Sequence, residues 1–387
     1  MLSLFRQWKW YSLKHTWFGP LTFITIFLSL FALNPTSSNP IHHFIFLSYQ
    51  IPNEDGDRHL SEARPQYGKG LWDIAFVTFY TIVLSFTREF IMQEFLQPLA
   101  RRTQLKSRAK QFRFMEQAYT AIYFAVLGPF GLYVMKRTPV WYFNVAGMYE
   151  DYPHRTHDAA FKFYYLFQAA YWAQQAIVMM IGMEKPRKDF KELIAHHVIT
   201  LTLIALSYRF HFTYMGLAIY ITHDISDFFL ATSKLLNYIN HPLVGPYFIF
   251  FMCTWLYLRH YLNILILISE FYEFKTVGPY MLDWENEQFK CLISHVISTF
   301  LLGGLQMLNL VWLGWVLRTA WRYVWLDVKE DDRSDDDEKE WREEMREEVE
   351  RRAREEDLLR AEQEMRTRAA EKKVVLGSAK VGKKRSK

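Results

Sequence analysis

The chain has 387 residues, of which 18% are aromatic, and its formal net charge of +5 is mild. This charge does not suggest a nucleic-acid-binding protein, and two cysteines, Cys253 and Cys291, do not suggest a disulfide scaffold. The mean hydropathy of −0.09 conceals a very apolar body that is offset by a highly charged C-terminal tail. Basic residues cluster at the ends of apolar segments, a pattern typical of integral membrane proteins.

Eight apolar segments come close to the length needed to cross a membrane. A helix that spans a bilayer core of about 30 Å needs about 20 predominantly apolar residues. We therefore predict an all-α membrane protein with about eight transmembrane helices, at residues 17–33, 71–92, 115–134, 161–183, 194–210, 213–237, 245–268 and 292–317. The first segment lacks a small-residue cleavage site before NPTSSNP, which favours an uncleaved span over a signal peptide.

The charges of the loops predict the orientation. Four regions on one side of the expected bundle are basic: Arg6, Lys9 and Lys14; the loop from Arg101 to Arg113; Lys185, Arg187, Lys188 and Lys191; and Arg318, Arg322 and Lys329. The loops at 34–70, 135–160 and 269–291 are balanced or acidic. Because basic loops stay in the cytosol, both termini should be cytosolic, and an even number of spans agrees with this.

The composition changes from about residue 327, where aliphatic residues almost disappear and Glu/Arg pairs dominate. We expect three parts: residues 1–69 with the first span, a transmembrane domain at 70–325, and a charged cytosolic tail at 326–387, helical or disordered. Ser334 precedes three acidic residues and is a candidate phosphorylation site. The ending KKRSK partly matches a dilysine-type retrieval signal, which favours the endoplasmic reticulum membrane.

Two acidic residues and a histidine interrupt the sixth segment, in YITHDISDFFL at 220–230. An aspartate near the middle of a bilayer span costs about 2.5–3.5 kcal/mol, so Asp224 and Asp227 should face the interior of the bundle. The fifth and sixth segments should form a tight helical hairpin, with its turn near residue 211 or 212. That turn places His196 and His197 level with Asp224 and Asp227, in the cytosolic third of the membrane.

A carboxylate beside an imidazole fixes its tautomer and raises its basicity, which suits a general base or a nucleophile. Buried His–Asp pairs that only join two helices are the structural alternative. A zinc or iron site is a further alternative. However, the histidines of HRTH, His154 and His157, should lie at the lumenal end, far from His196, so we expect no metal.

The residues from 196 to 239, HHVITLTLIALSYRFHFTYMGLAIYITHDISDFFLATSKLLNYI, closely resemble the signature region of the ceramide synthases, which carry a TLC domain. The resemblance is strongest to the fungal branch and covers about residues 70 to 325. It implies six central spans around a lipid cavity, with further spans outside, and N-acylation of a sphingoid base by a fatty acyl-CoA. It also assigns the family's paired histidines to His196 and His197 and its two aspartates to Asp224 and Asp227.

The implied reaction needs acyl-CoA as a co-substrate and no cofactor. One route passes through an acyl-histidine, and the other uses a histidine as general base on the sphingoid amine. We expect His223 to contact the substrate, and Lys185, Arg187, Lys188 and Lys191 to meet the CoA phosphates unless they only set topology. Membrane lipid, a small single-span accessory subunit and a homodimer or a heterodimer with a paralogue are the expected partners.

The competing prediction is a non-enzymatic TLC-domain protein, such as a lipid transporter or a translocon-associated protein. A conduit does not need a nucleophile, so paired histidines with an Asp-x-x-Asp motif favour the enzyme. The sequence leaves open the acyl-chain length, the preferred sphingoid base and which histidine is acylated.

Overall fold

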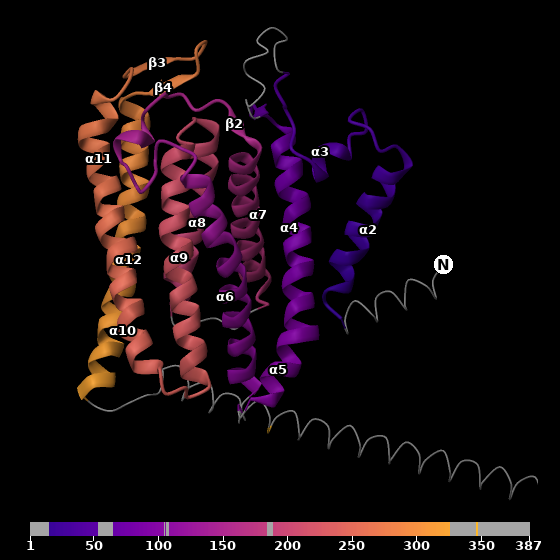
Figure 1. The fold of residues 1–387 in the computed structure, drawn as a ribbon, viewed down its shortest axis with the longest axis vertical. Helices are drawn as coiled ribbons and strands as arrows, with labels where there is room; N and C mark the ends of the chain where they lie inside the picture. The colour runs from indigo at the N-terminus through magenta and orange to yellow at the C-terminus, as the bar shows by residue number, and fades with distance from the viewer. Residues whose placement is uncertain are drawn as a thin grey trace, which may run out of the picture. The chain divides into compact units, whose positions relative to one another are not determined.

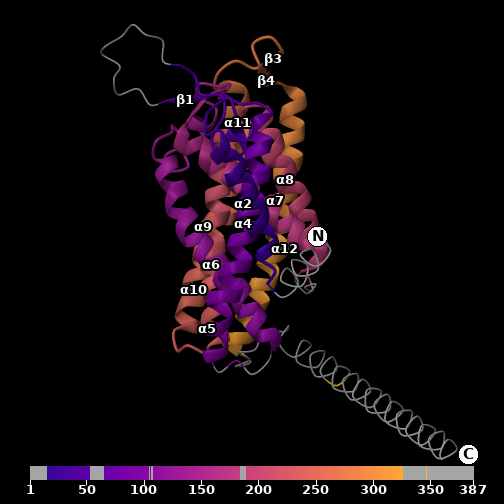
Figure 2. The same ribbon diagram turned by 90° about the vertical axis from the view of Figure 1, so that its right-hand side faces the viewer.

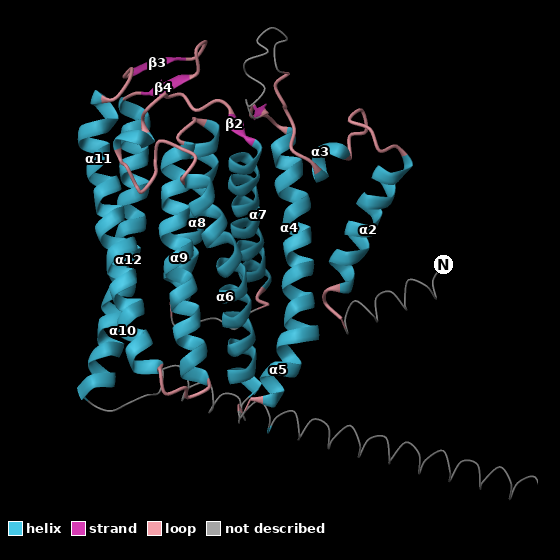
Figure 3. Ribbon diagram, viewed as in Figure 1, coloured by secondary structure: helices cyan, strands magenta, loops and turns pink. Residues whose placement is uncertain are grey.

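The computed structural model describes residues 15–52, 65–103, 105, 108–183, 189–325 and 346. Each of the eight predicted segments folds as a helix (Figures 1 and 3). In chain order these helices are α2 (Phe18–Leu33), α4 (Trp72–Phe90), α6 (Arg108–Met135), α7 (Ala159–Ile181), α8 (Phe190–Arg209), α9 (Thr213–Tyr238), α10 (Val244–Trp255) with α11 (Asn263–Thr276), and α12 (Leu292–Trp325).

Five helical stretches of the described residues are long and apolar enough to cross a membrane, at 72–102, 108–135, 190–209, 244–276 and 292–323. The predicted all-α membrane class is therefore confirmed, whereas the number of eight spans stays a prediction. Helix α2 has only 16 residues. Helices α7 and α9 carry buried polar side chains such as Lys162, Gln168 and Asp224, which lower their hydropathy.

Two spans continue further than the sequence pattern predicted, each through a π-helical segment. The second span continues beyond α4 through a π-helical segment, η1 (Ile91–Leu96), into α5 (Gln97–Arg102). The seventh span is one continuous rod in which a second π segment, η3 (Leu256–Leu262), joins α10 to α11. Isolated π turns often mark functional sites in helices, and η3 carries the buried residue Arg259.

The short elements gather at one end of the bundle, where the acidic loops lie (Figures 1 and 2). They are α3 (His42–Ile45), the 3₁₀ turn η2 (Ala146–Met148), and two antiparallel strand pairs. Strand β1 (Gln66–Tyr67) pairs with β2 (His157–Asp158), and β3 (Met281–Asp283) pairs with β4 (Gln288–Lys290). Helix α5 and the start of α10 lie at the opposite end, where the basic loops are.

Aromatic packing and one buried ion pair join the helices around α7. Tyr123 of α6 stacks on Tyr171 of α7, with ring centroids 3.7 Å apart. At the end of the bundle that carries the strand pairs, Lys162 Nζ lies 2.7 Å from Asp73 Oδ1 of α4, and both side chains are buried. Tyr208 of α8 donates its hydroxyl to the same carboxylate at 2.8 Å. Helix α7 is thereby fixed between α4 and the α8–α9 hairpin.

Candidate active site

The expected hairpin is present, because α8 ends at Arg209 and α9 begins at Thr213. His211 in the turn has a φ of 64°, which reverses the chain within three residues. The hairpin brings the polar residues of both helices into the interior of the bundle. His196, His197, His223 and Asp224 are buried, and the side chain of Asp227 is 19% exposed.

Three imidazoles form the centre of this site. The His196 ring lies 5.8 Å from the His197 ring and 6.4 Å from the His223 ring, measured between centroids. The rings of His196 and His223 are inclined by only 28°, so they face each other across the hairpin. Trp172 of α7 and Trp312 of α12 pack against His196 at 5.6 and 5.2 Å. His196 is therefore enclosed by aromatic rings and shielded from solvent.

Backbone carbonyls fix the orientation of two of these rings. Nδ1 of His197 lies 2.8 Å from the carbonyl oxygen of Leu193, and Nδ1 of His223 lies 2.8 Å from that of Ile219. A carbonyl oxygen can only accept a hydrogen bond, so each Nδ1 must carry the proton. In a neutral ring the lone pair then sits on Nε2. Each histidine thus presents a basic nitrogen away from its own helix.

Asp224 is completely buried and points toward α7. Its Oδ2 accepts a hydrogen bond from the Tyr164 hydroxyl at 2.8 Å and another from the amide of Gln168. The amide oxygen of Gln168 in turn accepts from the hydroxyl of Tyr123 on α6 at 3.1 Å. A polar network inside the membrane therefore connects α6, α7 and α9.

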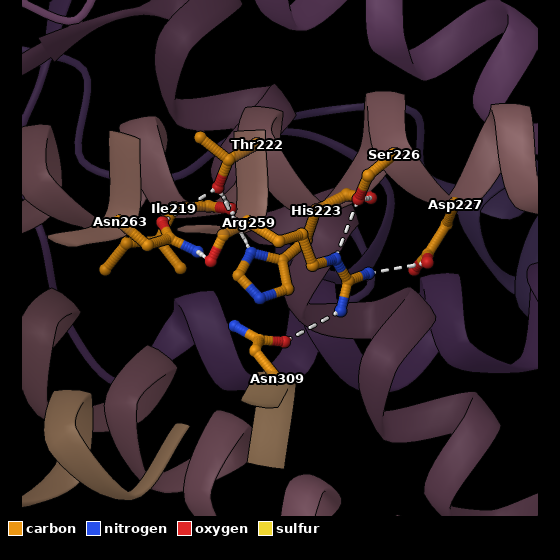
Figure 4. Close-up of polar contacts among 8 residues, drawn as sticks. All are labelled: Ile219, Thr222, His223, Ser226, Asp227, Arg259, Asn263 and Asn309. Carbon is orange, nitrogen blue, oxygen red and sulfur yellow. Dashed lines mark hydrogen bonds and ion pairs between the residues drawn. The ribbon is translucent and has the colours of Figure 1, made fainter. Parts of the chain in front are cut away.

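Asp227 points to a different neighbour, the π segment η3. Nη2 of Arg259 lies 2.5 Å from Asp227 Oδ1, while Nε donates to Ser226 at 2.7 Å and Nη1 to Asn309 of α12 at 3.2 Å (Figure 4). The guanidinium also covers the Trp255 ring, with Cζ 4.4 Å from its centroid. The arginine therefore holds α9, η3 and α12 together around a buried charge pair.

The direct contact of the two aspartates with the paired histidines, expected from the hairpin, is not what the structure shows. The recorded partners of these carboxylates are a phenol, an amide and a guanidinium. A hairpin fixes depth to within about one turn, but it does not fix which neighbour each helix face meets. His196 consequently faces His223 and not Asp227. The catalytic assignment of the four residues stays a prediction.

Sequence reasoning missed Arg259, Asn309, Tyr164 and Gln168. The signal for Arg259 was available, because an arginine inside an apolar run such as WLYLRHYL needs an internal partner. The other three residues carry no comparable signal in the sequence, and only their positions in the folded bundle identify them. Among the described residues, no group of three or more His, Cys, Asp or Glu side chains is arranged to hold a metal ion.

An apolar cavity of about 220 Å³ begins at His223 and extends toward the β3–β4 hairpin. His223, Thr200 and Trp172 lie on its wall next to the polar site. Leu282, Trp284 and Phe289 of the hairpin region line its other end. Tyr165 and Trp172 are the two residues of α7 that line it, while most other residues at 161–175 are buried between helices. A hydrocarbon chain fits this lining.

The candidate phosphate-binding residues are only partly described. Lys191 is exposed at the start of α8, on the side of the basic loops. Lys185, Arg187, Lys188 and the candidate phosphorylation site Ser334 lie outside the described residues. Their roles therefore stay predictions.

The fold and the site define a multi-span helical membrane protein with imidazoles, carboxylates and a guanidinium buried beside an apolar cavity. The TLC domain family matches residues 113–318. The chain is 54% identical to a sphingosine N-acyltransferase-like protein, FUM17, of Gibberella moniliformis, over 83% of this chain and 82% of the relative. It is 48% identical to sphingosine N-acyltransferase lac1 of Schizosaccharomyces pombe, over 80% and 78%. It is 44% identical to ceramide synthase LAG1 of Saccharomyces cerevisiae, over 84% and 79%.

The chain therefore belongs to the TLC-domain family and, within it, to the fungal sphingosine N-acyltransferases, or ceramide synthases. The resemblance noted in the sequence is confirmed.

Proposed function

We propose that this protein is a sphingosine N-acyltransferase that transfers a fatty acyl group from acyl-CoA to the amine of a sphingoid base. The observation that carries this proposal is the apolar cavity that ends at the buried imidazole of His223, with His196 directly behind it. An acyl chain in the cavity would bring its thioester to the only end of the described cavity lining that carries a histidine. The relatives favour this enzyme over a lipid conduit.

The substrates meet at a site with limited access to water. A sphingoid amine is mostly protonated at neutral pH, so it must lose a proton before it attacks the acyl carbon. In the covalent route, an imidazole nitrogen attacks the thioester, CoA leaves as the thiolate, and the amine then displaces the imidazole. Enclosure by Trp172 and Trp312 would protect the acyl-imidazole from hydrolysis.

We assign the covalent route to His196, because its ring is held by aromatic contacts and the structure records no hydrogen bond on its Nδ1 within the described residues. Arg259 keeps two of its five N–H groups beyond the three recorded hydrogen bonds. A fixed cation at this position would stabilise the oxyanion formed at the acyl carbon.

The reaction needs no cofactor beyond acyl-CoA, whose head would remain at the cytosolic mouth near the basic loops. We place the protein in the endoplasmic reticulum membrane with both termini in the cytosol, and expect a small accessory subunit or a second synthase chain as its partner. These assignments follow from the loop charges and from the resemblance to the family.

The test is direct acylation by the detergent-purified protein. Incubation with sphinganine or phytosphingosine and a mixed pool of acyl-CoA species should yield N-acylated bases, identified by mass spectrometry. A preparation that is folded but forms no amide with any acyl-CoA would contradict the proposal. The distribution of chain lengths in the product would show how much of the cavity the acyl chain fills.

A further inference from the structure

The imidazole of His223 has a geometry that differs from those of the paired histidines. Of the three rings, His223 alone lines the cavity, as judged from the described residues. Its Nδ1 is bonded to the carbonyl of Ile219 at 2.8 Å, so the lone pair is on Nε2. The structure records no hydrogen bond on that Nε2 within the described part of the chain, although it is buried. A buried basic nitrogen without a partner, at the wall of a cavity, is ready to accept a proton.

The second observation is the spacing between His223 and His196. Their ring centroids are 6.4 Å apart and the rings are nearly parallel. Reacting atoms approach to about 3–3.5 Å, and a general base lies about 2.6–3.2 Å from the atom whose proton it takes. The two imidazoles come from facing helices and are near enough to act on one bound substrate.

His197 has a different position. Its ring is turned by 86° from that of His196, and it is not part of the cavity lining. Adjacent residues on a helix point about 100° apart, so two neighbouring imidazoles cannot both face one substrate equally well. A histidine one helix away, across the hairpin, meets this requirement better.

We propose that His223 is the general base of acyl transfer and works with His196 as a catalytic pair across the α8–α9 hairpin. This inference rests on the proposed N-acyltransferase function. Nε2 of His223 takes a proton from the sphingoid ammonium, which leaves a neutral amine. The amine nitrogen forms a bond to the acyl carbon as the bond to His196 breaks. The second amine proton leaves with the departing imidazole and passes to the CoA thiolate formed earlier, which becomes the free thiol. His223 then releases the first proton to solvent.

Substitution of His223 by Asn tests this role. The Asn side-chain amide can still donate to the Ile219 carbonyl, as Nδ1 does, but it has no basic nitrogen. We expect the turnover rate of N-acylation to fall about 10²–10⁴-fold, the usual contribution of a general base, with the KM for acyl-CoA little changed. The matched control is His295→Asn in α12, because His295 is also buried but packs on Phe271 and Phe274 outside the cavity. We expect this control to keep its activity.

Wild-type activity in the same assay separates the two proposals. If the wild type forms no amide, the proposed function fails. If the wild type is active and folded His223→Asn is within about threefold of it, only the assignment of His223 fails.

A label on the unaltered protein covers the case in which the variant does not fold. A sphinganine analogue that carries a chloromethyl ketone in place of the amine should alkylate the nearest basic nitrogen, with loss of chloride. Peptide mass spectrometry of the active wild-type protein should then find the label on His223. Labelling that spares His223 would overturn the inference.

Discussion

At the scale of single residues, the site depends on charges and hydrogen bonds that membrane lipid cannot replace. Asp227 and Arg259 neutralise each other at 2.5 Å, and Ser226 and Asn309 satisfy other donors of the guanidinium. A charge without a partner inside a bundle is far more costly than the intact pair. Arg259 is therefore as much a part of the site as the motif residues on α9.

Removal of Arg259 alone should leave the Asp227 carboxylate without a counter-ion. We expect Arg259→Met to destabilise the purified protein by about 3–5 kcal/mol, the usual cost of breaking a buried ion pair. The double variant Arg259→Met/Asp227→Asn should recover part of this stability. Thermal melting in detergent of the wild type, Arg259→Met, Asp227→Asn and the double variant measures the coupling between the two residues. Strictly additive losses of stability would show that the pair is not formed.

The sequence identified His196, His197, His223, Asp224 and Asp227, because polar side chains in an apolar span are conspicuous by their cost. It did not predict their contacts. The depth argument set Asp227 against the histidines, whereas the angular position of Asp227 turns it toward η3. Contacts of this kind depend on the relative rotation of neighbouring helices, which no local pattern encodes.

At the scale of the helices, close approach of α6 to α7 and α9 holds the Asp224 network in place. A Cβ atom on Gly131 would lie 2.5 Å from the Tyr164 hydroxyl and 3.0 Å from Ile221. The same hydroxyl donates to Asp224. Glycine at position 131 therefore leaves the space that this hydrogen bond requires.

Gly131→Ala should displace Tyr164 and weaken its bond to Asp224. We expect a loss of about 1–3 kcal/mol in stability, as for other overpacked cores, together with reduced acylation. Gly128→Ala, one turn earlier on α6, is the matched control, since its Cβ would lie 3.7 Å from Ile225 in ordinary contact. Equal melting temperatures for the two variants would contradict this account of the packing.

The helices themselves were largely predictable, because their apolar runs are long and are separated by charged or polar loops. The α8–α9 turn was found at residues 210–212, as the sequence predicted. The π segments η1 and η3 and the β3–β4 pair were not predicted. A π turn differs from an α turn by one inserted residue, and hydrophobic periodicity over a buried helix is too weak to reveal it.

At the scale of the whole molecule, the two ends of the bundle differ in chemistry. Polar residues outside the spans collect at the end that carries the strand pairs. There Lys69 Nζ lies 3.2 Å from His211 Nδ1, and His211 Nε2 lies 3.4 Å from Glu287 Oε2. Burial lowers the pKa of Lys69 to about 7, although Asp73 and Glu287 oppose the shift. This end should therefore respond to pH near neutrality.

The lowered pKa of Lys69 predicts a pH-dependent stability. Between about pH 7 and the ordinary lysine pKa of about 10.5, the unfolded chain binds a proton that the folded protein has released, so stability rises with pH in this window. Lys69→Met should remove this contribution. Melting temperatures measured from pH 6.5 to 9 should rise more for the wild type than for the variant, and parallel profiles would refute the assignment.

The orientation predicted from the loop charges can be tested with single cysteines. Lys191 and Glu285 are exposed at opposite ends of the bundle, and a background with Cys253 and Cys291 replaced by alanine leaves only the introduced thiol. In sealed microsomes, an impermeant maleimide should label Lys191→Cys at once and Glu285→Cys only after the membrane is opened. The reverse pattern would place the basic loops, and the entry of acyl-CoA, in the lumen.

The central claim is that an imidazole buried beside the cavity performs the acyl transfer. The most direct measurement is N-acylation of sphinganine by purified wild-type protein and by His196→Asn, each with its melting temperature. We predict amide formation by the wild type and a loss of more than about 100-fold in the variant, with melting close to that of the wild type. Full activity of folded His196→Asn would contradict the account.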